Sequence, residues 1–159
     1  MKVREVMTNR IARVREGSSV YQAAEIVALS GASDLMVVDD HGNLVGVISS
    51  GDILRASLPK TEDILAEGGT LEQAFALFLK MGRELSQRPI AALTITQPIV
   101  LDPDDHVAKV AVTLVENNIH SLPVVRERRL IGLVTRATIL ETVVGSMQGV
   151  PLETRAPNA

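Results

Sequence analysis

A short stretch in the first third of the chain carries the residues best suited to hold a ligand, and it reads Gly46-Val47-Ile48-Ser49-Ser50-Gly51-Asp52. Residues 45–48 are apolar or small, which predicts a buried strand. Ser49 follows where a helix N-cap is expected, and a helix start favours an anion such as phosphate. The carboxylate of Asp52 suits the vicinal hydroxyls of a ribose. The stretch therefore predicts either a nucleotide-type site or an ordinary capped strand-to-helix turn, and a motif this short leaves both open.

The chain contains the pattern twice. At one constant spacing the identical pairs are Val20/Val107, Ala24/Ala111, Leu35/Leu122, Val37/Val124 and Val38/Val125; after a one-residue gap near His41 they are Leu44/Leu130, Gly46/Gly132, Ile53/Ile139 and Leu54/Leu140. The second copy of the motif reads Gly132-Leu133-Val134-Thr135-Arg136-Ala137-Thr138. An internal repeat determines the architecture of a chain, so we expect two copies of one structural unit.

Each copy predicts a strand, a helix, a two-stranded hairpin and a closing helix, which places the chain in the α/β (α+β) class. The first copy is expected as strand 11–14, helix 20–30, strands 35–38 and 44–48, and helix 50–57, after a helical turn at 1–7. The second is expected as strand 98–101, helix 106–117, strands 122–125 and 130–134, and helix 135–144. We expect repeat 1 to span 1–57, repeat 2 to span 89–147, and 148–159 to be a flexible tail.

Residues 58–88 have no counterpart in either repeat and predict a helical insertion. Gly68-Gly69 divides it into two helical pieces, and Thr70 with Gln73 forms a capping box for the second. That helix carries an apolar stripe of Leu71, Ala74, Phe75, Phe78 and Leu79. We expect the stripe to cover the core between the repeats. Contact with a partner protein or a second copy is the alternative.

Composition excludes several classes of function. The 159 residues are 46% hydrophobic and carry a net charge of −3. The negative charge argues against binding to nucleic acid through a basic surface. The absence of cysteine excludes disulfides and thiolate metal sites. Without a membrane-length apolar run or a signal-peptide segment, we expect a soluble, cytoplasmic protein that spans no membrane. The three histidines lie in separate segments, and no nucleophile elbow or lysine-bearing phosphate loop occurs, so we expect neither an enzyme nor a metal site.

Two further segments give the chain a family resemblance, namely Val6-Met7-Thr8 before the first strand and Ile119-His120-Ser121-Leu122-Pro123-Val124-Val125 in the second repeat. With the duplicated Gly-apolar-apolar-Ser/Thr motif, the chain resembles a tandem pair of CBS domains, the cystathionine β-synthase module, also called a Bateman module. The resemblance covers nearly all of the chain except 58–89 and the tail. It implies two βαββα repeats packed about a pseudo-two-fold axis, with two clefts that bind AMP, ADP, ATP or S-adenosylmethionine.

The resemblance also implies roles for particular residues. Asp52 would bind ribose and Ser49 phosphate, while Thr135, His120 and Arg136 of the second repeat would reach phosphates. Ile11, Ala12, Leu35 and Met36 would line the adenine slot, with Ser33 and Asp34 at its polar edge. Leu35 and Met36 suit a plain core position equally well, and Arg136 a solvated helix start.

The second repeat departs from the family pattern, because Thr138 stands where the ribose-binding aspartate is expected. A neutral hydroxyl gives up charge-assisted hydrogen bonds worth about 1.5–3 kcal/mol, which corresponds to roughly one to two decades of affinity. We therefore predict one competent cleft, at Asp52, and a second that is weak or empty.

Two functions from different classes fit these features. The first is a regulatory module that binds an adenine nucleotide or another adenosyl ligand and signals its occupancy to a separate protein. For a CBS pair without an attached catalytic domain, the resemblance also implies a homodimer. The alternative is a structural adaptor that binds a protein partner without a small ligand.

Overall fold

The computed structural model describes residues 1–149, which form two compact units. The central unit comprises Ala12–Pro98. The terminal unit joins Met1–Ile11 to the residues from Ile99 onward. The expected tail at 148–159 lies almost wholly outside the described residues.

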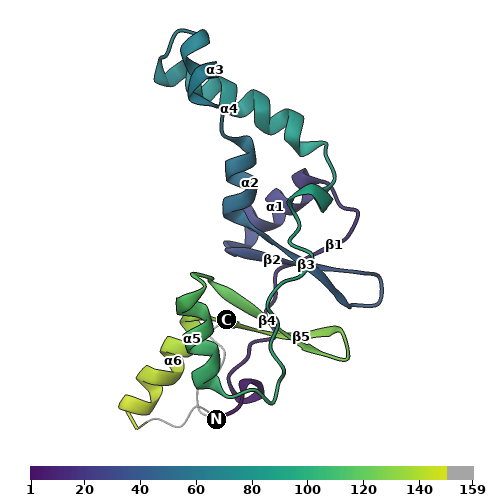
Figure 1. Cartoon of the computed structure of the whole chain (residues 1–159), viewed down its shortest axis with the longest axis vertical. Coiled ribbons are helices and arrows are strands. Elements are labelled where there is room, and N and C mark those ends of the chain that lie inside the picture. The colour runs from purple at the N-terminus through teal and green to yellow at the C-terminus, as the bar shows by residue number, and fades with distance from the viewer. Residues whose placement is uncertain (150–159) are drawn as a thin grey trace. The chain divides into compact units, whose positions relative to one another are not determined.

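The central unit contains the first repeat and the insertion. A three-stranded sheet has the order β1-β2-β3, with β1 (Arg13–Arg15) parallel to β2 (Asp34–Val38) and β2 antiparallel to β3 (Leu44–Ser49). Helices α1 (Val20–Ser30) and α2 (Ser50–Ser57) lie on the same side of this sheet (Figure 1). Ser19 caps α1 in a capping box with Gln22, and Gly31 ends the helix with a left-handed φ of 68°. The predicted strand–helix–strand–strand–helix order is confirmed.

The terminal unit contains the second repeat. Helix α5 (Val107–Glu116) leads to a hairpin of β4 (Ser121–Arg126) and β5 (Arg129–Thr135), and α6 (Arg136–Met147) follows directly. Glu127 and Arg128 form the turn with φ of 49° and 72°. Positive φ at both central residues is typical of the tight type I′ hairpin turn. The turn is therefore two residues long, and β4 and β5 each reach one residue closer to it than expected, at Arg126 and Arg129.

The expected first strand of the second repeat, 98–101, does not form. Within the described residues only Leu101 makes a ladder contact there, as an isolated bridge with Val124. Pro98 lacks a backbone donor, as does Pro103 just beyond Leu101. Proline residues on both sides limit the pairing to a single position.

Each unit is completed by a segment that precedes the other repeat in the sequence. In the terminal unit, the 3-10 helix Val3–Glu5 leads to Thr8, which exchanges backbone hydrogen bonds of 2.9 Å with Leu133 of β5. In the central unit, the 3-10 helix Ile90–Leu93 leads to Ile95, which bonds Val47 of β3 in the same way at 2.9 and 3.0 Å. The two lead-in segments are thus exchanged between the repeats.

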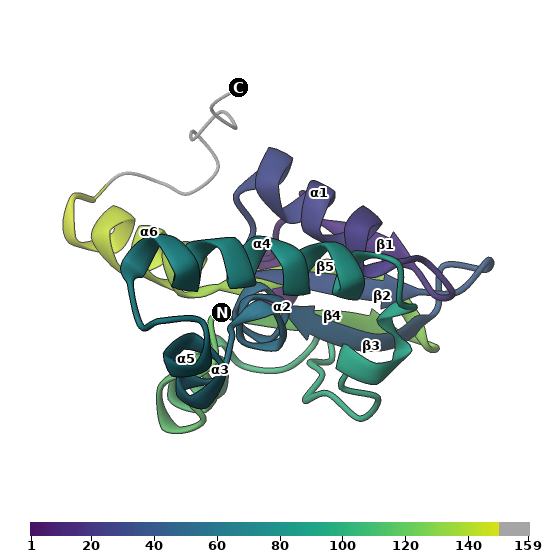
Figure 2. The same cartoon turned by 90° about the horizontal axis from the view of Figure 1, so that it is seen from above.

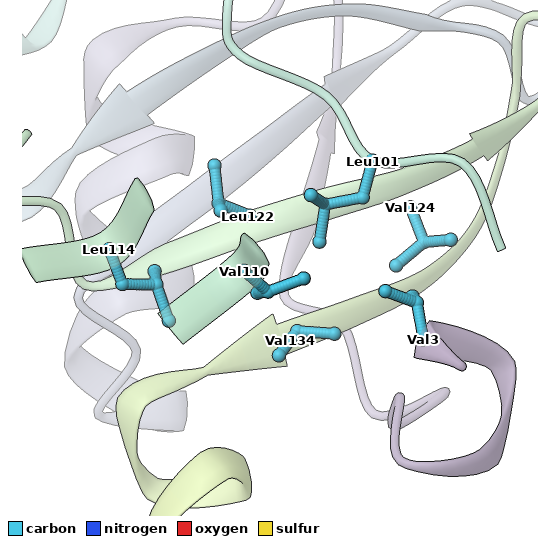
Figure 3. Close-up of a cluster of buried hydrophobic side chains, with 7 residues drawn as sticks. All are labelled: Val3, Leu101, Val110, Leu114, Leu122, Val124 and Val134. Atoms are coloured by element: carbon cyan, nitrogen blue, oxygen red, sulfur yellow. The ribbon is translucent and has the colours of Figure 1, made fainter. Parts of the chain in front are cut away.

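The exchanged segments contribute to the cores. Val3 is fully buried in a cluster with residues 101–134 of the terminal unit, where its side chain lies near Val124 and Val134 (Figure 3). Ile90 is equally buried in the cluster of the central unit, with Leu35, Val37 and Ile48. Each valine- and leucine-rich core therefore requires a lead-in segment from a distant part of the chain.

The insertion folds as the expected pair of helices, α3 (Thr61–Ala66) and α4 (Leu71–Ser86), with Gly68-Gly69 between them. The capping box of Thr70 and Gln73 is confirmed. Helix α4 contacts α1, α2 and α3, and two views place it beyond α1 and α2 on the helical side of the sheet (Figures 1 and 2). The apolar stripe is covered only in part, because Ala74 and Phe78 are half-buried whereas Leu71 is 90% exposed and Phe75 61% exposed.

The glycines of the two repeated motifs make room for the exchanged segments. A Cβ atom on Gly46 would lie 2.5 Å from the backbone oxygen of Ile95, whereas one on Gly132 would lie 2.5 Å from the sulfur of Met7. The thioether can rotate away and the backbone cannot. We expect Gly46→Ala to lower the free energy of unfolding by about 2 kcal/mol and Gly132→Ala by clearly less. Chemical denaturation measures both, and equal losses would contradict this assignment.

The N-terminal segment is also held by charge. Asp104 accepts from Lys2 at 3.0 Å and Arg4 at 2.6 Å, with Arg126 at 3.7 Å. The hydrogen bond from Lys2 is the main cause that lowers the pKa of Asp104 below its ordinary 3.8, and the charges of Arg4 and Arg126 add to it. This contribution to stability is present above pH 3.8 and is lost as the pH falls through the lowered pKa of the folded protein.

Asp104→Asn should therefore reduce the loss of melting temperature between neutral pH and pH 3. Asp40→Asn is the matched control, because Asp40 is an exposed aspartate paired with a single arginine, Arg15. If the melting temperature of Asp104→Asn depends on pH in the same way as that of the parent protein, the role of Asp104 in holding the N-terminal segment is contradicted.

Candidate ligand-binding site

The first motif forms the junction between β3 and α2. Ser49 ends the strand and caps the helix, with its hydroxyl accepting from the backbone N–H of Asp52 at 3.0 Å. The predicted N-cap is confirmed. Since α2 begins directly at Ser50, the first-turn donors and the Asp52 carboxylate lie beside one another at the end of a strand. This arrangement offers an anion site and a hydroxyl acceptor together.

Asp52 is ionised and partly accessible. Its carboxylate pairs with Arg55 one turn later and its side chain is 30% exposed. The hydrogen bond from the Arg55 guanidinium, followed by the one from the Ser49 hydroxyl, lowers the pKa of Asp52 below its usual range. An ionised carboxylate is an acceptor only, which is the state required to bind two sugar hydroxyls. Arg55, 71% exposed, can swing away at little cost.

Most of the other predicted residues of the first repeat gather around this junction. The register of the hairpin places Asp34 opposite Ser49, and the carbonyl of Ser33 accepts from the Ser50 N–H at 2.8 Å. Ala12 is tied to the same strand, because its carbonyl accepts from the Met36 N–H at 3.0 Å. Backbone pairing thus brings Ala12, residues 33–36, Ser49 and Asp52 together at one end of the central sheet.

The two apolar residues predicted for an adenine slot are both fully buried. Leu35 belongs to the hydrophobic cluster of the central unit. Met36, the next residue along β2, points to the opposite face of the sheet and is also 0% exposed. Leu35 is therefore a core residue of the central unit, and Met36 is buried on the other face of the sheet.

The second motif uses the same junction differently. Thr135 caps α6, and its hydroxyl accepts from the Thr138 N–H at 3.1 Å. The Thr138 hydroxyl in turn accepts from the Thr135 N–H at 3.2 Å, and it lies 2.9 Å from the Thr135 hydroxyl. The side chain at the ribose position is thus part of a capping box, whereas Asp52 faces Arg55.

Arg136 and His120 are held close to each other within the terminal unit. The Nε of Arg136 donates to the Ile119 carbonyl at 2.9 Å, and its Nη2 donates to the Asn118 side chain at 3.2 Å. The His120 carbonyl accepts from the Arg136 N–H at 3.2 Å, and the imidazole is on an exposed residue. The guanidinium therefore has local partners that a phosphate would have to replace. Ile11 lies at the end of the N-terminal segment of this unit.

A cavity of about 510 Å³ opens beside Thr138 in the terminal unit. Helix α6 and strand β5 supply four of its lining residues and the N-terminal segment supplies the rest. These residues are 4–10, Ile131, Thr138, Glu141 and Thr142. Apart from Thr138, they did not figure among the predicted contacts. The spacing of Thr138, Glu141 and Thr142 on one helix face was the available signal.

Two further features are absent from residues 1–149, the part of the chain that the structure describes. No helix among them is both long enough and apolar enough to cross a membrane. In the same range, no cluster of three or more His, Cys, Asp or Glu side chains could hold a metal ion.

Comparison with known proteins identifies the family. The family model for the CBS domain matches residues 3–59 and 90–145. The chain therefore belongs to the CBS domain family, and it contains two CBS domains in tandem. Both matches begin at a 3-10 helix, so each includes the lead-in segment that precedes its repeat.

This chain matches only part of a longer protein among its curated relatives. An uncharacterised protein of Methanocaldococcus jannaschii is 28% identical over 152 residues, which are 96% of this chain and 34% of the relative. The chain thus spans about a third of the length of that protein.

Solved CBS-domain pairs share the fold over nearly the whole chain. The CBS-pair protein CBSX2 from Arabidopsis thaliana is 25% identical with a TM-score of 0.77, covering 92% of this chain and 96% of CBSX2. CBSX2 has also been solved in complex with AMP, with a TM-score of 0.70 to this chain. The CBS domain pair of protein MJ0100, in complex with 5′-methylthioadenosine and S-adenosyl-L-methionine, is 25% identical with a TM-score of 0.65, covering 92% of this chain and 98% of that pair.

Proposed function

We propose that this chain is a regulatory module that binds an adenosyl ligand and communicates its occupancy to another protein. The observation that carries the proposal is the junction at Ser49, where an ionised and partly exposed Asp52 stands at the positive end of the α2 helix dipole. The adenosyl complexes of two similar CBS pairs support the same ligand class.

The roles of the residues follow from their chemistry. Asp52 accepts hydrogen bonds from the ribose hydroxyls, and the start of α2 at Ser49 receives a phosphate or carboxylate of the ligand. Ala12 and residues 33–36 supply backbone groups and apolar surface for the base. In the second repeat, Thr135, His120 and Arg136 are the anion-facing groups. Ile11 is, with its chain neighbour Ala12, a proposed contact of the base.

Regulation rather than catalysis suits this set of residues. Nothing in the junction provides a nucleophile with an activating base. An occupied site instead stabilises one arrangement of the protein over another, which is how ligand binding can alter contact with a partner. We further propose that the chain acts as a homodimer and that the receiving partner is a separate protein.

A second function is favoured by one observation. The exposed apolar stripe of α4 is a feature of protein-binding surfaces. An adaptor without a small ligand would use this stripe and leave the junction at Ser49 as a plain capped turn.

Thermal denaturation with a ligand panel separates the two functions. AMP, ADP, ATP, S-adenosylmethionine and 5′-methylthioadenosine should be tested at millimolar concentration, with GMP as the control for the base. Because a ligand that binds only the folded state stabilises it by mass action, at least one adenosyl compound should raise the melting temperature by several degrees. The absence of a shift with every adenosyl compound would favour the adaptor.

A further inference from the structure

The cavity of about 510 Å³ in the terminal unit is separate from the site proposed at Asp52, and its walls come from the N-terminal segment, β5 and α6. Its volume falls in the range of about 300–1,000 Å³ that is usual for small-molecule sites. Val6, Met7 and Ile131 give it half-buried apolar surface. Met7 fits there because Gly132 has no side chain, since a Cβ on Gly132 would lie 2.5 Å from the Met7 sulfur. A flexible thioether in the wall lets the apolar surface adapt to a ligand.

The polar groups of the cavity differ from those of the first repeat. In the alignment of the two repeats, Asp52 corresponds to Thr138, and Arg55 corresponds to Glu141. The Thr138 hydroxyl is already bonded to Thr135 in the capping box of α6, so it offers no charged acceptor to a ribose. Glu141 places a carboxylate where the first repeat has a guanidinium, and a carboxylate favours a ligand with a cationic group. The cavity therefore suits a different ligand from the one proposed for Asp52.

The charges that line the cavity balance one another. Among the described residues, this charged lining consists of two arginines and two glutamates, namely Arg4, Glu5, Arg10 and Glu141. Arg4 donates to Asp104 at 2.6 Å, and the Glu5 carboxylate accepts from the backbone N–H of Lys2. These two side chains thus serve to hold the N-terminal segment. Arg10 and Glu141 bring opposite charges to the cavity from two different elements, which matches a ligand that carries both an anionic and a cationic group.

We infer that this cavity binds an α-amino acid with a large apolar side chain. Arg10 holds the carboxylate of the amino acid and Glu141 holds its ammonium group, while the apolar side chain lies against Met7 and Ile131. The cavity is thus a second ligand site, and it does not depend on adenosyl binding at Asp52. Because the N-terminal segment forms one wall, an occupied cavity also stabilises the docking of this segment on β5 and α6.

Thermal denaturation of the full chain tests the class of ligand. L-leucine, L-methionine and L-phenylalanine should be added at millimolar concentration, and at least one should raise the melting temperature by several degrees. Isocaproate, which is leucine without its amino group, and isoamylamine, which is leucine without its carboxylate, are the matched control compounds. Each should give a clearly smaller shift than L-leucine. Equal shifts with these two compounds, or no shift with any of the three amino acids, would overturn the proposal.

Charge-neutralising variants test the assigned residues by isothermal titration with the most stabilising amino acid. Glu141→Gln and Arg10→Gln should each weaken binding about 10-fold or more, because each removes one charge-assisted contact. Glu116→Gln and Arg129→Gln are the matched controls, since both residues are exposed in the same unit and do not line the cavity. They should leave the affinity unchanged.

The variant Asp52→Asn separates this site from the adenosyl site. It should bind the amino acid as tightly as the parent protein does, whether or not the parent binds an adenosyl compound. Amino-acid binding that is lost in Asp52→Asn and kept in Glu141→Gln would overturn the assignment to the terminal cavity. Displacement of the amino acid by AMP in Asp52→Asn would likewise show that the cavity takes an adenosyl ligand instead.

Discussion

Replacing Asp52 with Asn should weaken binding of the adenosyl ligand by about 10- to 150-fold. Hydrogen bonds to an ionised acceptor are worth about 1.5–3 kcal/mol, and each 1.4 kcal/mol is a factor of about ten in affinity. The amide keeps the size of the carboxylate and removes its charge. Isothermal titration with whichever compound stabilises the parent protein most measures the change.

Two control variants make this loss specific. Asp63→Asn removes a carboxylate from the first turn of another helix, α3, and should leave the affinity unchanged. Arg55→Ala removes the ion pair of Asp52 but keeps the carboxylate. It should leave affinity unchanged or improve it, because Arg55 competes with the ligand for Asp52. Loss of binding in Arg55→Ala and none in Asp52→Asn would assign the phosphate to Arg55 and contradict the role of Asp52.

Thr138→Asp should create a second adenosyl site, or tighten a weak one by about 10- to 150-fold. The position already lines a cavity of about 510 Å³ in the terminal unit. An aspartate in the first turn of α6 is favoured by the helix dipole, and it can accept from the Thr135 N–H as the threonine does. The substitution should therefore be tolerated by the fold.

The stoichiometry of binding is the measurement for this variant. Titration should change from one site per chain to two. Thr138→Asn is the matched control because it has the shape of aspartate without the charge, and it should retain one site. A stoichiometry of one for Thr138→Asp, with unchanged affinity, would show that the missing carboxylate is not what limits the second repeat.

The repeat and its elements could be predicted from the sequence because they depend on local signals. The caps at Ser49 and Thr70 follow from a hydroxyl before a helical pattern, and both are present. The paired apolar runs at 35–38 and 122–125 predicted the hairpins for the same reason. Membership in the CBS family, indicated by these residues, is confirmed by the family match.

The exchange of lead-in segments could not be predicted, because it depends on contacts between residues far apart in the sequence. Nothing near Thr8 indicates that it pairs with Leu133, or that Gly132 leaves room for Met7. The same limit applies to the cavity beside Thr138, whose walls join residues 4–10 to α6. It also applies to α4, where the hydrophobic pattern predicted an amphipathic helix but not that Leu71 and Phe75 would face outward.

The candidate site falls between these cases. Local sequence placed Ser49 and Asp52 at one junction, and the pairing of β2 with β3 brings Asp34 beside them. The pairing of Asp52 with Arg55 was not anticipated, although an acid and an arginine three residues apart on a helix are neighbours. The roles of the predicted residues in binding stay predictions until a ligand is titrated.

A calorimetric titration of the purified chain with AMP and with S-adenosylmethionine tests the central claim most directly. We expect saturable binding of at least one of them at a single site per chain, with the affinity retained in Thr138→Ala and weakened about 10- to 150-fold in Asp52→Asn. Binding that persists in Asp52→Asn and disappears in Thr138→Ala, or no heat from either compound at millimolar concentration, would contradict the claim that Asp52 holds the ribose of an adenosyl ligand.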